Sequence, residues 1–518
     1  MSTGFIIWSP AGHQIVYQIV SPRGPFVAPN REDGVLVNRI NSVIMKPLVP
    51  FSSSRKPPHN AAMNPRTGKS YMDLPISGAD AYYGRGHGEP RKPNFKRIAV
   101  AVSLALGTIG MLYKPAFQHY QRIANDCSKT LTVDKRAQRV LTTTPLIDGH
   151  VDFAVFLRGV FDNHIESDDF AGAFENGTLS GHLDLARLRT GRSGGAFWSV
   201  FAPCPDNGTD FSDENYAASL QFTLQAIDTM KRLFAAYPED FAHDVDGADA
   251  FKAFRRGKLV SPLGVEGLHQ IANQPSNLRL FRDLGVRYAT LTHNCHNKYA
   301  DAALQSNPFK KATPVWGGVS PDGRKLVHEM NRIGMIVDLS HVSEDTMIDT
   351  LGGKDDWEGS KAPVIFSHSS AFSICPHPRN VKDHVLQLVK KRNSVVLVNI
   401  YPGFISCFDE GNENGVPTED TENATLEKVA DHITYIGDLI GYDHVGIGSD
   451  FDGIDRVPEG LEDVTKYPAL IAELLRRGVS EADAAKVVGG NVIRVWKEVD
   501  AVSAQMKADG APILEDEF

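Results

Sequence analysis

The chain has 518 residues, of which 42% are hydrophobic and 23% are charged, and its formal net charge is -9. This composition allows a sizeable buried core, and it excludes both a disordered chain and a membrane protein with many spans. The negative net charge argues against a nucleic-acid-binding surface, so we expect no nucleic-acid partner.

Residues 1–95 form the first predicted region. The stretch is rich in Pro, Gly, Ser, Asn and basic residues and lacks sustained hydrophobic periodicity, as in Ser52–Pro58. A segment of this kind cannot bury enough apolar surface to offset the entropy lost on ordering. We therefore expect a disordered basic arm.

An uncharged, apolar run over residues 98–113 follows the arm, with Lys96 and Arg97 before it and Lys114 after it. Its length of about 16 residues is slightly short for a bilayer span, although flanking cations can extend it. Because the cations lie mainly on its N-terminal side, we predict a transmembrane signal anchor over 96–115 in a single-pass membrane protein whose main domain is lumenal or extracellular. A cleaved signal peptide and a buried core helix are the alternatives.

Three glycosylation motifs and most of the cysteines stand in the main domain. Acceptor asparagines are used only on the lumenal or extracellular side, where cysteines are also free to pair. Buried free thiols are the alternative for the cysteines. The candidate acceptors are Asn176, Asn207 and Asn423, and the cysteines of this domain are Cys204, Cys295, Cys375 and Cys407.

From residue 130 to residue 505, short apolar strands alternate with amphipathic helical segments such as Leu326–Ile333 and Leu426–Ile440. Eight such units favour an α/β fold of the closed (β/α)8 type, in which reactive residues gather at the C-terminal ends of the strands. An acidic tail over 506–518 is expected to follow. The predicted strands are Leu146–Asp148, Ala196–Phe201, Leu259–Val265, Tyr288–Leu291, Met335–Leu339, Val364–Phe366, Val395–Ile400 and Val445–Ile447.

Polar residues of the metal-ligand type follow nearly every predicted strand. A single histidine in such a place is more often a hydrogen-bonded structural residue than a ligand. A whole set at one mouth of a barrel is much harder to assign to chance. The set consists of His150, Asp152, Glu266, His293, His341, His368 and Asp450.

Five members of this set predict a site for two Zn2+ ions. His150 and Asp152 lie two residues apart on a strand, so their side chains share a face and suit one ion. We expect His341 and His368 to hold the second ion, and Glu266 to bridge both through its two oxygens. A water shared by two cations becomes a hydroxide nucleophile near neutral pH, so this site would hydrolyse its substrate with a metal-bridging hydroxide.

Hydrolysis of an amide also requires a donor for the oxyanion and a group that carries a proton to the leaving nitrogen. His293 is placed to be the first of these groups and Asp450 the second. Both are therefore predicted to be catalytic residues that contact the substrate.

The segments that contain these residues resemble those of the membrane (renal) dipeptidase family, in the same order along the chain. The resemblance extends roughly over residues 140–500. The matching segments are Leu146–Asp152, Gly264–Gly267, Leu291–His293, Asp338–His341, Pro363–Ser370 with Arg379–Val381 behind it, and Gly448–Gly453.

The resemblance implies a binuclear zinc dipeptidase on a (β/α)8 barrel, with the five metal ligands named above. It implies that His293 contacts the scissile carbonyl, that Asp450 aligns the attacking water or moves its proton, and that Arg379 binds the free carboxylate of the dipeptide. A guanidinium suits this last role because it meets both carboxylate oxygens at once. The family further implies a possible homodimer and two disulfides, Cys204–Cys295 and Cys375–Cys407.

The C-terminus departs from animal members of the family, which look like secreted precursors that end in a hydrophobic signal for a lipid anchor. This chain finishes with the short acidic segment Ala511–Phe518. Attachment to the membrane is therefore expected through residues 98–113.

Three other functions stay open. Another binuclear amidohydrolase, acting on non-peptide amides or esters, would share the barrel, but such enzymes commonly bridge their metals with a carbamylated lysine where this chain has Glu266. A mononuclear zinc deaminase would usually begin with His-x-His, and Asp152 stands at that place. A catalytically silent, membrane-anchored binding protein would have lost at least one ligand, and none is missing.

Overall fold

The computed structural model describes residues 6–8, 14–16 and 131–517. A 10-stranded sheet forms its centre, and its strands pair in parallel. The sheet curls into a TIM-barrel-like α/β fold. Its strands are β3 (Leu146–Val151), β4 (Ser193–Ser199), β5 (Phe241–Ala242), β6 (Leu259–Val260), β7 (Leu263–Glu266), β8 (Val286–Thr290), β11 (Ile336–Asp338), β12 (Ile365–Phe366), β13 (Val395–Val398) and β16 (Val445–Ile447).

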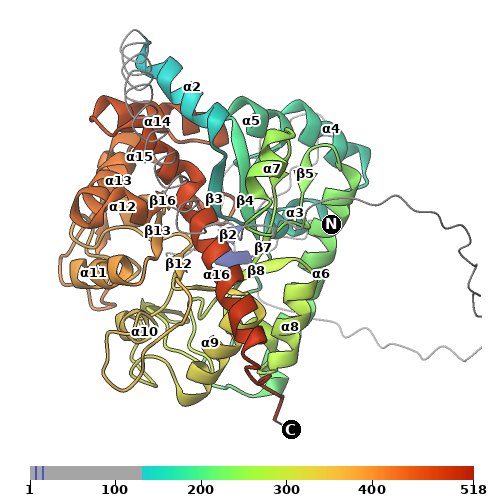
Figure 1. Cartoon of the computed structure of the whole chain (residues 1–518), viewed down its shortest axis with the longest axis vertical. Helices are drawn as coiled ribbons and strands as arrows, with labels where there is room; N and C mark the ends of the chain where they lie inside the picture. The colour runs from blue at the N-terminus through green and yellow to red at the C-terminus, as the bar shows by residue number, and fades with distance from the viewer. Residues whose placement is uncertain (1–5, 9–13, 17–130, 518) are drawn as a thin grey trace, which may run out of the picture. The chain divides into compact units, whose positions relative to one another are not determined.

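The predicted alternation of strands and helices is confirmed. Each expected strand overlaps an observed one, and the expected strand over 259–265 is divided into β6 and β7. Helices surround the sheet (Figure 1). They are α2 (Val133–Thr143), α3 (Phe153–Phe161), α4 (Asp168–Asn176), α5 (Leu185–Thr190), α6 (Asp213–Ala236), α7 (Ala250–Arg255), α8 (Pro275–Asp283), α9 (Pro321–Ile333), α10 (Glu344–Thr350), α11 (Asp383–Lys391), α12 (Pro402–Ile405), α13 (Leu426–Ile440), α14 (Tyr467–Arg476), α15 (Glu481–Ala485) and α16 (Asn491–Ala508).

Helix α9 illustrates how local sequence sets these elements. The hydroxyl of Ser320 caps its N-terminus by accepting from the backbone N–H of Gly323, and Pro321 occupies the first turn, where no N–H is needed. Gly334 ends the helix in the left-handed conformation, with φ 79°. The chain then turns directly into β11, the strand that leads to His341.

The first and last strands of the barrel are joined at their C-terminal ends. The backbone N–H of Asp152 donates to the carbonyl of Phe451 (2.8 Å), and that of Asp450 donates to the carbonyl of His150 (3.0 Å). The buried carboxylate of Asp148 on β3 accepts from the backbone N–H (2.8 Å) and the hydroxyl (2.6 Å) of Ser449, which follows β16. This seam therefore brings two predicted site segments side by side.

The interior of the barrel is filled with apolar side chains that meet helix α16. Phe197 of β4 packs against Tyr288 of β8 and Trp496 of α16, with ring centroids 5.3 and 5.5 Å apart. Helix α16 also bonds to the first residue of β16, since the side-chain amide of Asn491 donates to the carbonyl of Val445 (2.8 Å). The N-terminal end of the barrel is thereby closed, which leaves the C-terminal end for polar chemistry.

Smaller elements lie outside the barrel. Strands β9 (Leu304–Ser306) and β10 (Phe309–Lys311) form one antiparallel hairpin, and β14 (Cys407–Phe408) pairs with β15 (Thr418–Glu419). Within the predicted arm, the structure describes only the antiparallel pair β1 (Ile6–Trp8) and β2 (Gln14–Val16), so the expected disorder of the arm lies largely outside the described residues. The tail after α16 returns to the domain, where the carboxylate of Asp516 accepts from the backbone N–H of Ser276 (2.8 Å).

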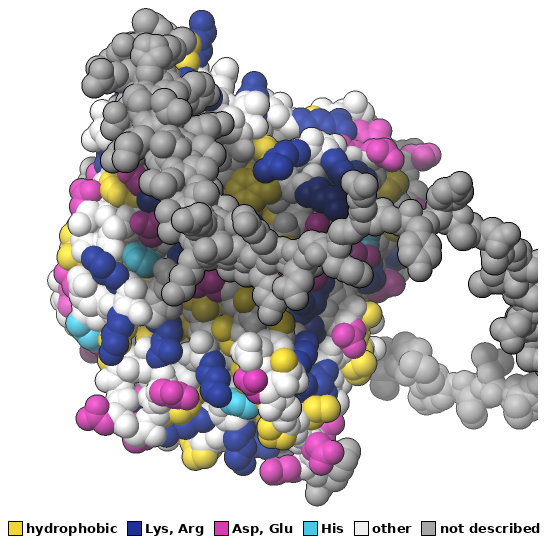
Figure 2. All heavy atoms as spheres, viewed as in Figure 1, with side chains coloured by type: hydrophobic (Ala, Val, Ile, Leu, Met, Phe, Trp, Pro, Cys, Tyr) yellow, Lys and Arg dark blue, Asp and Glu magenta, His cyan; other side chains and the backbone are white. Residues whose placement is uncertain are grey.

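The expected localisation is contradicted. No helix within residues 6–8, 14–16 and 131–517 is long and apolar enough to span a bilayer, and the predicted anchor over 96–115 lies outside these residues. The long helices that are described carry charged residues, such as Asp228 on α6 and Arg494 on α16. Basic and acidic side chains are interspersed over the face of the molecule drawn in Figure 2. The structure therefore does not support the predicted single-pass membrane protein.

The seam yields a stability prediction. Replacing Asp148 with Ala removes the acceptor for the backbone N–H and hydroxyl of Ser449, the backbone N–H of His150 and the hydroxyl of Tyr467. Buried donors left without partners are costly, so we expect the free energy of unfolding to fall by roughly 3 kcal/mol or more. Thermal unfolding followed by circular dichroism measures the change. Asp244→Ala, at a side chain that is 74% exposed, is the control, and an equal Tm in both variants would contradict the role of the seam.

Candidate metal centre

The five predicted metal ligands meet at the C-terminal mouth of the barrel. His150 and Asp152 lie at the end of β3, Glu266 ends β7, and His341 and His368 follow β11 and β12. The residues form overlapping groups whose donor atoms lie within 4.8 Å of one another. All five are buried.

One carboxylate oxygen, Oε1 of Glu266, lies at the centre of this cluster. The Nε2 atom of His341 is 2.9 Å from it, that of His368 is 3.4 Å away, and that of His150 is 3.5 Å away. Asp152 approaches from the β3 side, with its Oδ2 atom 3.1 Å from Nε2 of His150. Its Oδ1 atom is buried and has no hydrogen-bond partner among the described residues.

The histidines are held so that their Nε2 lone pairs point into the centre. The Nδ1–H group of His341 donates to Oδ1 of Asn294 (2.9 Å), and that of His368 donates to the hydroxyl oxygen of Ser367 (2.8 Å). The hydroxyl of Ser367 in turn donates to the carboxylate of Asp338 (2.6 Å). Both Nε2 atoms therefore lack a proton and face each other at 3.0 Å.

This donor set fits divalent zinc. Imidazole nitrogens and carboxylate oxygens are its usual ligands when cysteine is absent. Two facing lone pairs beside a carboxylate repel one another, and a cation between them converts that repulsion into attraction. The unpartnered oxygen of Asp152 supplies a further ligand atom. These residues therefore form a candidate site for metal ions.

Burial controls the protonation of the cluster. It lowers the pKa of His341 and His368 well below the ordinary range, helped by the positive charge of Arg379, so both imidazoles are neutral. Burial also tends to lower the pKa of His150, but the carboxylates of Glu266, Asp152 and Asp450 outweigh it and raise that pKa to about 10. The β3 side of the cluster is thus strongly negative and attracts cations.

Asp450 lies beside the metal cluster on a strained backbone. Its φ is 67°, and that of His341 is 66°, a left-handed conformation that non-glycine residues rarely adopt. The Nδ2 group of Asn399 donates to Oδ2 of Asp450 (3.1 Å), while Oδ1 lies 4.0 Å from Nε2 of His150. Burial, reinforced by the nearby carboxylate of Asp152, raises the pKa of Asp450 to about 7.

His293 lies at the edge of the cluster. Its ring centroid is 4.2 Å from that of His341 and 4.7 Å from that of Phe201. Cys204 lies next to His293, with its Sγ atom 3.8 Å from Nδ1 of the imidazole. Burial lowers the pKa of His293 well below the ordinary range, assisted by the neighbouring His269, so this imidazole is neutral and retains one N–H donor.

Arg379 is fully buried and has spare donors. Its Nη2 atom reaches the carbonyl of His368 at 3.5 Å, and its guanidinium lies over the ring of Phe404, 4.9 Å from the centroid. Its Nε and Nη1 atoms have no hydrogen-bond partner among the described residues. Burial lowers its pKa, but Asp450 and Glu266 oppose that shift and the group stays cationic. A buried cation with two free N–H directions is suited to an anionic ligand.

Several positioning residues escaped the sequence analysis. Asp148 and Asp338 precede ligand histidines by two and three residues, and a carboxylate inside an apolar strand is the signal that could have identified them. Gln270 carried no such signal. Its side-chain oxygen accepts from the backbone N–H of Glu266 (3.0 Å), and its Nε2 donates to the carbonyl of Val200 (2.7 Å).

Both expected disulfides are present in the structure, which confirms their pairing. The Cα atoms of Cys204 and Cys295 are 6.1 Å apart, and those of Cys375 and Cys407 are 5.0 Å apart. The three candidate glycosylation sites, Asn176, Asn207 and Asn423, are exposed. Their modification stays a prediction.

Comparisons with known proteins extend over the barrel. A family model described as membrane dipeptidase, peptidase family M19, matches residues 134–510. The dipeptidase verJ of Clonostachys rogersoniana is 46% identical over 385 residues, which cover 74% of this chain and 91% of that protein. The dipeptidase tcpJ of Claviceps purpurea (strain 20.1) is 44% identical over 371 residues, which cover 71% and 80%. The solved structure of dipeptidase AC, a metallopeptidase of family M19, is similar with a TM-score of 0.57 and 26% identity, covering 69% of this chain and 99% of that one.

The close approach of Gly453 to the cluster yields a second prediction. A Cβ atom at this position would lie 2.1 Å from Oδ2 of Asp152 and 2.8 Å from Oδ1 of Asp450. Gly453→Ala should therefore displace both carboxylates and weaken metal binding by about 10-fold or more. Zinc titration of the purified variant measures the loss. Gly172→Ala on α4, where a Cβ meets nothing within 4 Å, is the control, and unchanged zinc affinity in both variants would contradict the prediction.

Proposed function

The chain belongs to the membrane dipeptidase family, peptidase family M19, and is a metallo-dipeptidase, so we propose how its residues hydrolyse dipeptides. The proposed cofactor is a pair of zinc ions. His150 and Asp152 would hold one ion, His341 and His368 the other, and Glu266 both. When bound, two zinc ions supply Lewis acidity that lowers the pKa of a shared water toward neutrality.

The observation that carries this proposal is the central place of Glu266. Its Oε1 atom is within 3.5 Å of the Nε2 atoms of three histidines that come from three different strand ends. A monodentate structural ion pair does not require such convergence. A carboxylate shared by two ions would require it, because the ligands of both ions would have to lie around the same side chain.

Asp450 is proposed to carry the proton. It takes a proton from the attacking water and returns it to the leaving nitrogen. The bond from Asn399 fixes Oδ2, which leaves Oδ1 directed toward His150 and the metal cluster. A carboxylate whose pKa is about 7 suits both halves of this task, because it accepts and releases a proton with little cost near neutral pH.

His293 is proposed to stabilise the oxyanion. As a neutral imidazole it keeps one N–H donor, and this donor strengthens its hydrogen bond as negative charge develops on the carbonyl oxygen. Arg379 is proposed to bind the carboxylate of the substrate with its unpartnered Nε and Nη1 groups. The distance between these two anchors would then select substrates with one residue beyond the scissile bond. A homodimer is kept as a proposal that rests on the family resemblance alone.

The bridging role predicts a joint loss of both ions. Glu266→Gln keeps the shape of the side chain and removes its charge, so zinc content should fall below one ion per chain and dipeptide hydrolysis should drop by at least about 100-fold. Atomic absorption beside a ninhydrin assay provides both readings. Glu239→Gln, at an exposed glutamate, should retain two ions and full activity. Two tightly held ions with normal turnover in Glu266→Gln would remove the bridge.

The role of Arg379 predicts selectivity for a free carboxylate. Amidation of a dipeptide removes the charge that pairs with the buried guanidinium, so kcat/KM should fall by roughly 10- to 100-fold. In Arg379→Met the free and amidated dipeptides should be cleaved at similar, low rates. Equal kcat/KM for the two substrates in the unmodified enzyme would exclude this role.

A further inference from the structure

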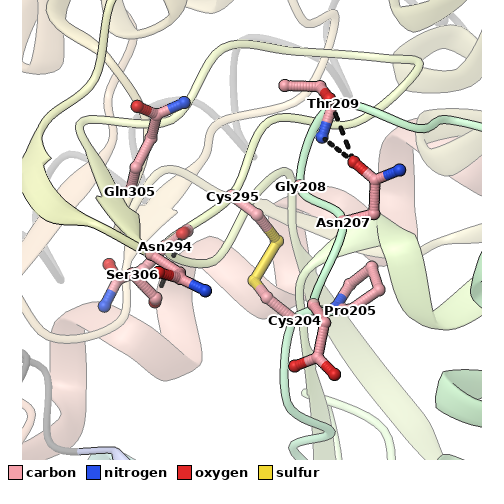
Figure 3. A pocket seen from close by; sticks show the side chains of 11 residues that line it. Cys204, Pro205, Asn207, Gly208, Thr209, Asn294, Cys295, Gln305 and Ser306 are labelled. Carbon is pink, nitrogen blue, oxygen red and sulfur yellow. Dashed lines mark hydrogen bonds between the residues drawn. A yellow bond between two sulfur atoms is a disulfide. The ribbon is translucent and has the colours of Figure 1, made fainter.

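A cavity of about 310 Å³ lies beside the metal centre, bounded by the loop after β4, the residues after β8 and the β9–β10 hairpin. The Cys204–Cys295 disulfide forms part of its wall. Figure 3 shows Gln305, Asn294 and Ser306 on one side of this disulfide, and Asn207 and Thr209 on the other.

The cavity shares its wall with the proposed catalytic residues. Asn294 and Cys295 directly follow His293, and Sγ of Cys204 lies 3.8 Å from Nδ1 of His293. Asn294 also accepts the Nδ1–H bond of His341 (2.9 Å). The cavity therefore adjoins the groups that are proposed to bind the metal ions and the substrate.

The wall presents hydrogen-bond donors that lack acceptors. Asn294 is only 2% exposed, and since its Oδ1 is used by His341, its Nδ2 group is the free end, with no partner among the described residues. Asn207 uses its Oδ1 to accept from the hydroxyl of Thr209 (3.0 Å), so its Nδ2 is also free. The side-chain amide of Gln305 makes no hydrogen bond within the described part of the chain. Three amides are thus available to a ligand.

The charge of the wall narrows the class of ligand. Among the described residues that line the cavity, Asp206 is the one that carries a charge. Its carboxylate disfavours an acidic side chain, and apolar side chains would leave Nδ2 of Asn294 without an acceptor. An uncharged side chain with a carbonyl oxygen satisfies the donors, and its own N–H groups can donate to oxygens such as that of Ser306.

We infer that this cavity is the specificity pocket for the amine-side residue of the dipeptide, and that it selects carboxamide side chains. The inference rests on the proposed function. Arg379 follows β12, whereas the cavity lies after β4 and β8, on a different part of the rim. With the substrate carboxylate at Arg379, the residue that carries the free amine is the one directed toward the cavity.

The test compares side chains of equal length. Gln-Gly should exceed Met-Gly in kcat/KM by at least about fivefold, since each hydrogen bond to an amide contributes roughly 1 kcal/mol. Gly-Gln and Gly-Met should show no such preference. Equal values for Gln-Gly and Met-Gly, or a preference confined to the carboxylate-side residue, would overturn the inference. Failure to cleave any of these four dipeptides would instead refute the proposed function.

Two variants assign the preference to the wall. Gln305→Leu and Asn207→Leu remove donors that make no bond to the metal ligands, and each should lower the ratio of Gln-Gly to Met-Gly toward one. Both kcat/KM values of the ratio are measured on the same variant, so a loss of active protein lowers both equally and leaves the ratio unchanged. Gln221→Leu, at an exposed glutamine on α6 outside the wall, should keep the ratio of the unmodified enzyme. An unchanged ratio in both wall variants would also overturn the inference.

Discussion

The structure depends on one electrostatic constraint, which is that the carboxylates of Asp152, Glu266 and Asp450 are buried together at the mouth of the barrel. Burial raises the pKa of Glu266 well above its ordinary range, and repulsion by the two neighbouring carboxylates adds to that rise. Such a group is stable only when cations offset its charge. Histidine protonation supplies part of this compensation at His150, and a pair of divalent ions would supply it in full.

The scaffold that holds these charges in place consists of further buried carboxylates that are not proposed ligands. Asp148 joins β3 to the segment after β16, and Asp338 joins β11 to Ser367 after β12. Each stands shortly before a ligand histidine and also holds the backbone there, since Asp148 accepts from the N–H of His150 (3.1 Å) and Asp338 from the N–H of Ser340 (3.1 Å). Fold stability and ligand geometry are therefore coupled at two points of the rim, and the strained φ of His341 persists because the bonds around it are satisfied.

The sequence predicted the strands and the residues at their ends because both depend on short patterns. An apolar run followed by histidine or carboxylate is visible in one segment, and a parallel barrel brings all such ends to one mouth. Partners that join distant segments left no comparable pattern. Gln270 reaches Glu266 and Val200 through a 3₁₀ turn, and nothing in its neighbourhood distinguishes it from a surface glutamine. The predicted membrane anchor over 96–115 lies outside the described residues, and no helix among those that are described is long and apolar enough to span a bilayer.

The residue that supports His341 shows how the centre and the cavity constrain each other. A carboxylate in the place of Asn294 would orient the imidazole equally well, but it would add a fourth negative charge to a cluster that already bears three. An amide oxygen accepts the same hydrogen bond at no cost in charge. It also leaves an N–H group on the opposite side, where the cavity begins. A neutral side chain at this position thus supports His341 and also provides the N–H donor proposed to bind the substrate side chain. Substrate selectivity and metal binding are therefore expected to change together when Asn294 is replaced.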